Sequence, residues 1–161
     1  MEKIFEKIGT YNLFNYFFPG VIFTYLLNSM VKYNLIQSDI IMGLFLYYFI
    51  GMIISRIGSL LIEPALKRLL KIEFSSYKDY ADSSKKDDKI QLLVEVTNTY
   101  RTIIAIPITI TIVWVYKILQ VYLNFRHEIG WVTLMVMLVI IFSVSYKKQS
   151  EYVKKRVEAN K

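Results

Sequence analysis

The stretch IIMGLFLYYFIGMIISRIGSLL, residues 40–61, decides the fold class of this chain. Arg56 is its one charged residue, and its length matches the roughly 20 apolar residues that cross a bilayer as a helix. A segment in hydrocarbon must pair every backbone N–H and C=O internally, which favours a helix over any open strand. The stretch therefore predicts a transmembrane helix over about residues 40–62.

Three further apolar stretches flank this one, at residues 8–31, at 102–123 with only Lys117 interrupting, and at 129–146. Each meets or approaches the length that a spanning helix requires. We therefore expect an all-α fold, a four-helix transmembrane bundle with spans at about 10–31, 40–62, 102–123 and 129–146. At 161 residues, the chain has room for this single membrane domain and no second globular module.

The positive charges predict the orientation of the spans. Sixteen lysines and arginines precede the first span, lie between the second and third, or follow the fourth, whereas the other two loops carry Lys32 and Arg126 alone. Cytoplasmic loops are the ones that accumulate positive charge. Both termini and the middle segment are therefore expected in the cytoplasm, where anionic membrane lipid accounts for the basic residues. Because these residues follow the membrane sidedness instead of forming one basic stripe, direct nucleic-acid binding is not expected.

Residues 65–101 are expected to form a cytoplasmic helical hairpin or stem, and residues 147–161 a cytoplasmic tail. Ser84 and Asp87 have the spacing of a capping box, which predicts a helix that starts there and runs unbroken into the third span. Just before the membrane, this helix presents four candidates for docking a soluble protein partner: Glu95, Asn98, Tyr100 and Arg101. The alternative for these four is an ordinary solvated helix face.

Small and polar residues recur at spacing four in the first two spans. Such stripes let helix backbones approach and add hydrogen bonds between helices. They predict either a contact between the two helices of one chain, or an interface between subunits or a wet lumen. The residues concerned are Gly20, Thr24 and Asn28 in the first span and Gly43, Gly51, Ser55 and Ser59 in the second.

Arg56 is the charged residue placed deepest in the second span, about six residues from its inner end. An ionisable residue inside a membrane is costly and marks a functional hypothesis. Two interpretations stay open: a structural arginine bonded to backbone carbonyls, to Glu63 or to lipid phosphate, and a functional arginine that lines a pore or holds a closed state. Pro19, Pro64 and Pro107 are expected to kink or end their helices.

The chain offers little material for catalysis. It has no cysteine, which excludes disulfides, thiolate metal sites and cysteine nucleophiles, and its single histidine, His127, has no motif partner. Phosphate-binding glycine loops and zinc motifs are absent from the sequence as well. We therefore expect neither an enzyme nor a cofactor or metal site.

Three short motifs resemble small four-pass proteins of bacterial anti-phage defence loci: NLFNYFFPG at 12–20, SRIGSLLIEP at 55–64 and NTYR at 98–101. The family meant is that of transmembrane effectors and sensors grouped with nucleotide-signalling or Kiwa-type systems. The resemblance implies a homo-oligomer in the bacterial inner membrane that perturbs or senses the membrane when a partner signals infection. The chain lacks a recognisable domain for binding a second messenger.

The sequence thus predicts an oligomeric inner-membrane effector or sensor that acts through its cytoplasmic stem. The alternatives are a passive membrane anchor or assembly subunit, and a small channel or transporter.

Overall fold

The computed structural model describes residues 9–124 and 126–159, and this part of the chain forms helices and no strand. The all-α fold class is therefore confirmed. The first helical segment consists of α2 (Thr10–Asn12), the π-helical turn η1 (Leu13–Phe17) and α3 (Phe18–Val31). The second consists of α4 (Ile40–Ile57), the π-helical turn η2 (Gly58–Ile62) and α5 (Glu63–Leu70). A short helix α6 (Tyr77–Ser84) then precedes the two long helices α7 (Lys89–Tyr122) and α8 (His127–Ala159).

Each π-helical turn ends two residues before a proline. Within an α-helix, the ring of a proline collides with the carbonyl four residues earlier. For Pro19 and Pro64 that carbonyl belongs to Asn15 and Leu60, and each of these residues lies inside a π-helical turn. The wider turn lets the helix continue past the proline, so neither proline ends its segment. Pro107, by contrast, lies inside α7, which remains one helix.

Three helical segments are long and apolar enough to cross a membrane: Ile40–Leu70, Lys89–Tyr122 and Glu128–Ala159. The first expected span is helical from Thr10 to Val31 but does not qualify with them, and it carries the polar residues Asn12, Asn15 and Asn28. The structure therefore supports three spanning helices by length and composition, not clearly four.

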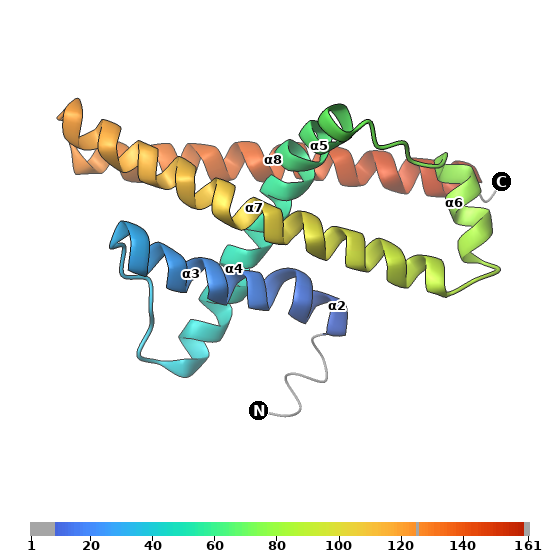
Figure 1. The fold of residues 1–161 in the computed structure, drawn as a ribbon, viewed down its shortest axis with the longest axis horizontal. Helices are drawn as coiled ribbons and strands as arrows, with labels where there is room; N and C mark the ends of the chain where they lie inside the picture. Colours follow the sequence, from blue (N-terminus) through green and yellow to red (C-terminus); the bar gives the residue numbers. More distant parts are fainter. Residues whose placement is uncertain (1–8, 125, 160–161) are drawn as a thin grey trace.

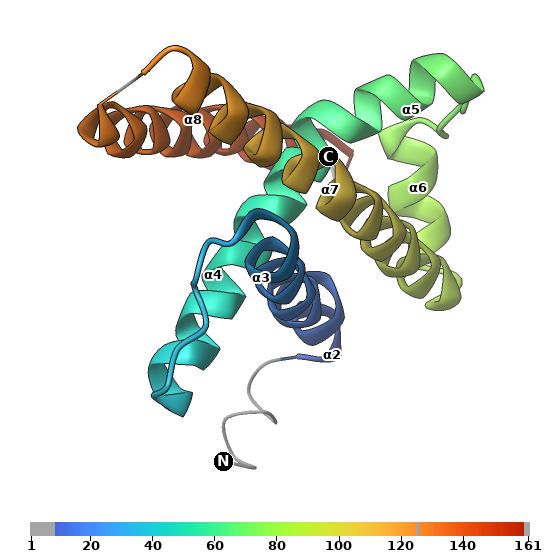
Figure 2. The same cartoon turned by 60° about the vertical axis from the view of Figure 1, so that its left-hand side comes forward.

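The helices are not all aligned with one another. Figure 1 shows α4 running steeply across α3 and α7, and Figure 2 shows α4 and α5 as one long diagonal column with α7 beside it. A buried apolar cluster lies where α3, α4, η2 and α7 meet. It consists of Phe23, Leu27, Val31, Ile54, Ile62, Ala105, Ile106 and Ile110.

Burial falls from the second helical segment to the last. In the most apolar windows of the three qualifying segments, 28%, 22% and 6% of the residues are buried, in chain order. The apolar face of α8 is thus mostly uncovered by the rest of the chain. Lipid covers such a face when the helix spans a membrane.

The expected stem is helical in three pieces, α5, α6 and the first turns of α7. The helix predicted to run unbroken into the third span does so, but it begins at Lys89 and not at Ser84, which is the last residue of α6. A side-chain cap is found at the start of the preceding helix, α6: the Oγ of Ser76 accepts a hydrogen bond from the backbone N–H of Asp79 at 3.2 Å. The sequence signal for this helix was Ser76 followed three residues later by Asp79. Beyond residue 146, α8 continues as a helix to Ala159, which covers the described part of the expected tail.

Candidate functional site: a polar junction of three helices

Three buried polar side chains from three different segments meet at one point. Asn15 of η1 and Thr102 of α7 are fully buried, and Ser55 of α4 is 3% exposed. The amide nitrogen of Asn15 donates to Ser55 Oγ at 3.1 Å and to the hydroxyl of Tyr11 at 3.0 Å. The hydroxyl of Thr102 donates to Asn15 Oδ1 at 2.7 Å and lies 3.3 Å from Ser55 Oγ. Because buried polar groups are costly when unpaired, this network binds the three segments together at a defined register.

Two glycines bring the first two segments close enough for this network. A Cβ added to Gly20 would collide with the backbone carbonyl of Tyr47, and one added to Gly51 would collide with the carbonyl of Tyr16. The backbones of α3 and α4 therefore touch at their crossing, as small residues permit. Of the two interpretations of the small-residue stripes, the structure places Gly20 and Gly51 in the contact within one chain.

A cluster of charged residues surrounds Glu63, next to the buried network. Arg101 Nη1 lies 2.5 Å from Glu63 Oε2, Lys67 Nζ lies 3.0 Å from Oε1, and Lys148 Nζ lies 3.7 Å from Oε2. Lys148 also donates to the carbonyl and the hydroxyl of Ser59, at 2.9 and 2.8 Å. One carboxylate from α5 thus holds cations from α5, α7 and α8 in place.

Arg101 and Thr102 are neighbours in α7, and each belongs to one of the two groups. Arg101 reaches the carboxylate of Glu63, whereas Thr102 reaches the amide of Asn15. The three motifs of the defence-protein resemblance therefore supply or adjoin this junction: Asn15 lies in the first, Ser55 and Glu63 in the second, and Arg101 in the third. We call the two groups together the polar junction; it comprises Asn15, Ser55, Ser59, Glu63, Lys67, Arg101, Thr102 and Lys148.

Arg56 does not pair with Glu63, which corrects one of the expected roles. Among the described residues, Arg56 has one hydrogen bond, from Nη2 to the hydroxyl of Tyr16 at the long distance of 3.4 Å. Glu63 instead forms an ion pair with Arg101. Arg101 lies in α7, so the spacing of residues along the second segment could not identify it as the partner. Arg56 is thus a half-buried, weakly bonded cation beside Ser55.

The other stripe residues lie apart from these contacts. Thr24 is buried, and its hydroxyl has no hydrogen-bond partner among the described residues. Asn28 is half-buried, and its backbone carbonyl accepts from Lys32 at the end of α3. Gly43 lies in the first turns of α4, where an added Cβ would meet the ring of Tyr47 at 3.3 Å.

The four proposed docking residues do not share one exposed face. Tyr100 is exposed, but Glu95 and Asn98 are half-buried, and Glu95 accepts from Gln91 at 3.5 Å. Arg101 is turned inward to Glu63, with 16% of its side chain exposed. Arg101 is therefore a structural member of the polar junction and is removed from the docking surface.

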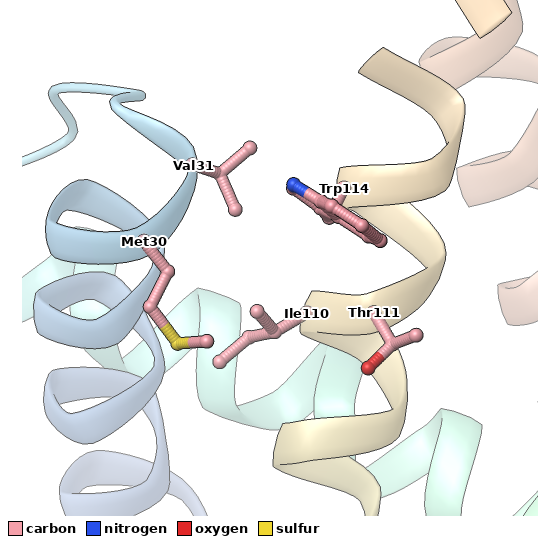
Figure 3. Close-up of a pocket in the computed structure, with 5 residues that line it drawn as sticks. All are labelled: Met30, Val31, Ile110, Thr111 and Trp114. Atoms are coloured by element: carbon pink, nitrogen blue, oxygen red, sulfur yellow. The ribbon is translucent and has the colours of Figure 1, made fainter. Parts of the chain in front are cut away.

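A shallow apolar pocket of about 220 Å³ lies between the C-terminal part of α3 and the C-terminal half of α7, away from the polar junction. Figure 3 shows Met30 and Val31 of α3 facing Ile110 and Trp114 of α7 across it. Beyond it, Lys117 of α7 donates to the carbonyl of Val31 and lies over the ring of Tyr33, 5.2 Å from the ring centre. Lys117 thus caps the C-terminus of α3.

Sequence reasoning missed Asn15, Lys67, Thr102 and Lys148 as members of the junction. A lone asparagine in the aromatic run of residues 13–18 was a usable signal, because an unpaired amide is expensive there. Thr102 and the lysines of the junction gave no such signal, since these residue types fit equally well at a solvated helix end. Comparisons with known protein families, curated proteins and solved structures give no match for this chain.

Proposed function

We propose that this chain is an oligomeric inner-membrane effector or sensor, of the kind implied by its resemblance to anti-phage defence proteins. In this proposal, a cytoplasmic partner contacts the stem, α7 transmits the event, and helix packing at the polar junction changes so that the membrane is perturbed. Adjustment at Pro19, Pro64 and Pro107 accommodates the change. Both termini and the stem lie in the cytoplasm.

The observation that supports this most is the continuity of α7 through the polar junction. Its 34 residues extend about 50 Å as one helix, from the stem to the far end of the apolar span. A force on the stem therefore reaches Arg101 and Thr102 without passing a loop. Those two residues are bonded to η1, α4 and α5 at the junction, so a displacement of α7 must break or exchange buried polar bonds.

The weakly bonded Arg56 is the second observation that supports the proposal. A charged group beside the junction with one long hydrogen bond gains free energy when it finds a better acceptor or water. A change in packing that exposes Arg56 to a wet lumen or to lipid phosphate supplies such an acceptor. Arg56 is thus poised to favour an altered arrangement of α3 and α4.

The test compares bacteria that express the wild type, Arg56→Leu or Arg68→Leu, with membrane potential followed by a voltage-sensitive dye during phage infection. Arg68 lies exposed in α5, so its variant makes the same chemical change away from the junction. We expect depolarisation with the wild type and with Arg68→Leu, and its loss with Arg56→Leu. If the wild type protects cells without depolarisation, the passive anchor is the better description, and equal behaviour of all three proteins removes Arg56 from the mechanism.

The oligomeric part of the proposal needs its own measurement, which is the mass of the protein in a native lipid disc. A single-chain mass would contradict it. Conductance by purified protein in liposomes without any partner would instead favour the small channel.

A further inference from the structure

The charged half of the polar junction is not electrically balanced. Three cations, Lys67, Arg101 and Lys148, lie within 4 Å of the single carboxylate of Glu63. The group therefore carries two positive charges in excess. The side chains of Glu63, Arg101 and Lys148 are 17%, 16% and 27% exposed, so bulk water solvates this excess poorly.

The arginine also has an unused donor. Arg101 binds Glu63 through Nη1, whereas its Nε is buried and has no hydrogen-bond partner among the described residues. A guanidinium offers five N–H donors in a planar arrangement that suits carboxylate and phosphate groups. A buried cation with a free N–H is a costly arrangement unless a further acceptor completes it.

Two aromatic side chains hold the flanking lysines at this place. Lys67 Nζ lies 3.9 Å from the ring centre of Phe74, and Lys148 Nζ lies 5.9 Å from that of Tyr152. Contacts of this kind favour a cation that stays over the ring. The fold thus positions the two lysines, from α5 and α8, at the carboxylate that the arginine of α7 binds.

From this geometry, we infer that Lys67, Arg101 and Lys148 bind one phosphate group, with Glu63 holding the three cations in position. Basic pockets between helices at the cytoplasmic end of a membrane domain are suited to lipid head groups. The phosphate is supplied either by an anionic lipid of the inner leaflet or by a soluble phosphate. This inference depends on the proposed membrane location but not on the proposed effector role.

The experiment measures the midpoint of thermal unfolding in lipid discs of phosphatidylcholine and of phosphatidylglycerol, and compares the two within each variant. Lys148→Gln removes a cation of the site, and Lys147→Gln makes the same change at the exposed neighbouring residue. We expect phosphatidylglycerol to raise the wild-type midpoint by about 2–4 °C. Lys147→Gln should retain this shift and Lys148→Gln should lose it. Because each comparison is made within one variant, loss of the Ser59 hydrogen bonds in Lys148→Gln does not affect the reading.

Inorganic phosphate added to the phosphatidylcholine discs identifies the source. A rise of the wild-type midpoint by phosphate alone assigns the site to a soluble ligand, whereas a rise with phosphatidylglycerol alone assigns it to lipid. No shift with either overturns the proposal, because it means that no phosphate group stabilises the folded protein. An equal loss in Lys147→Gln and Lys148→Gln overturns it in favour of diffuse surface attraction. Lys67→Gln, at a more exposed lysine, repeats the test if Lys148→Gln fails to fold.

Discussion

At the scale of single residues, Thr102 offers the sharpest test of the buried network. Thr102→Val keeps the shape of the side chain but removes the hydroxyl that donates to Asn15 Oδ1. Because the amide of Asn15 is then left with an unpaired buried oxygen, we expect a loss of about 1–2 kcal/mol in the free energy of unfolding. Unfolding in detergent, followed by circular dichroism, measures the change.

Thr111→Val is the matched control for this substitution. Thr111 lies exposed in the same helix, and its hydroxyl bonds the carbonyl of Pro107 one turn away. We expect a change of under about 0.5 kcal/mol. An equal loss in the two variants would mean that the cost belongs to threonine in this helix and not to the junction.

The second residue-scale prediction concerns Glu63. Glu63→Gln leaves Lys67, Arg101 and Lys148 beside one another without a carboxylate, so we expect the free energy of unfolding to fall by about 2 kcal/mol. Glu128→Gln is the control, because Glu128 pairs with Arg126 at a site where both side chains are more than 70% exposed. There we expect almost no change.

A double-mutant cycle shows whether Arg101 is the main partner. If it is, Glu63→Gln should cost much less in a protein that already carries Arg101→Gln. Additive losses from the two substitutions would contradict a direct pair and point to separate structural effects.

Some members of the junction were predictable from the sequence, but its pairings were not. Glu63 and Arg56 stood out as charges near or within an apolar span, and Ser55 as part of a small-residue stripe. The partner that Glu63 finds is 38 positions away in another helix. Which helices meet, and at what height, depends on their crossing angles, and no local pattern encodes that. For this reason the sequence left the partner of Arg56 open, with Glu63 as one of the alternatives, and the structure gives Glu63 to Arg101.

At the scale of elements, the crossing of α3 and α4 depends on two glycines. Gly20→Ala and Gly51→Ala each place a methyl group against the backbone of the partner helix, which cannot swing aside as a side chain can. The helices must separate, which weakens the bonds of Asn15 as well. We expect each variant to lose about 1–3 kcal/mol in stability, as in overpacked cores.

Gly43→Ala distinguishes close packing from the general effect of adding a methyl group. Gly43 lies in α4 too, but its added Cβ meets the ring of Tyr47, which can move by the few tenths of an ångström required. Alanine is also the better helix former by about 1 kcal/mol. Thermal unfolding should therefore show no loss for this variant, and a loss equal to that of Gly51→Ala would contradict the close crossing.

Local patterns predicted the individual elements well where a helix is long and apolar, and less well at its ends. The unbroken α7 followed from its composition, because residues 89–122 contain one proline and no glycine. The π-helical turns before Pro19 and Pro64 did not follow, since a proline in a helix can be accommodated by a kink, a break or a wider turn. Tertiary contacts choose among these, here the contact of α3 with α4 and of η2 with α7.

At the scale of the whole molecule, the steep crossing of α4 decides how the helices share the membrane. α4 packs on α3 and α7 through its C-terminal half, whereas its N-terminal end diverges from α7 (Figure 1). α8 contacts the rest of the described chain at α6, α4 and η2. Such an arrangement covers only part of each apolar span. Lipid covers the rest when the helices span a membrane. The first helical segment is the one expected span that does not qualify by length and composition.

The last prediction concerns that first segment and follows from the charge distribution. The chain has no cysteine, so single cysteines can report the side of the membrane without further engineering. If the first segment spans, Gly9→Cys and Ser38→Cys lie on opposite sides, with residue 38 outside; if it does not, they lie on the same side. The positive charges favour the first arrangement. In intact cells, a membrane-impermeant maleimide should label Ser38→Cys, whereas Gly9→Cys, Ser83→Cys and Ser150→Cys should need permeabilised cells. Labelling of residues 9 and 38 together, from either side, would reduce the protein to the three spans that its hydropathy supports.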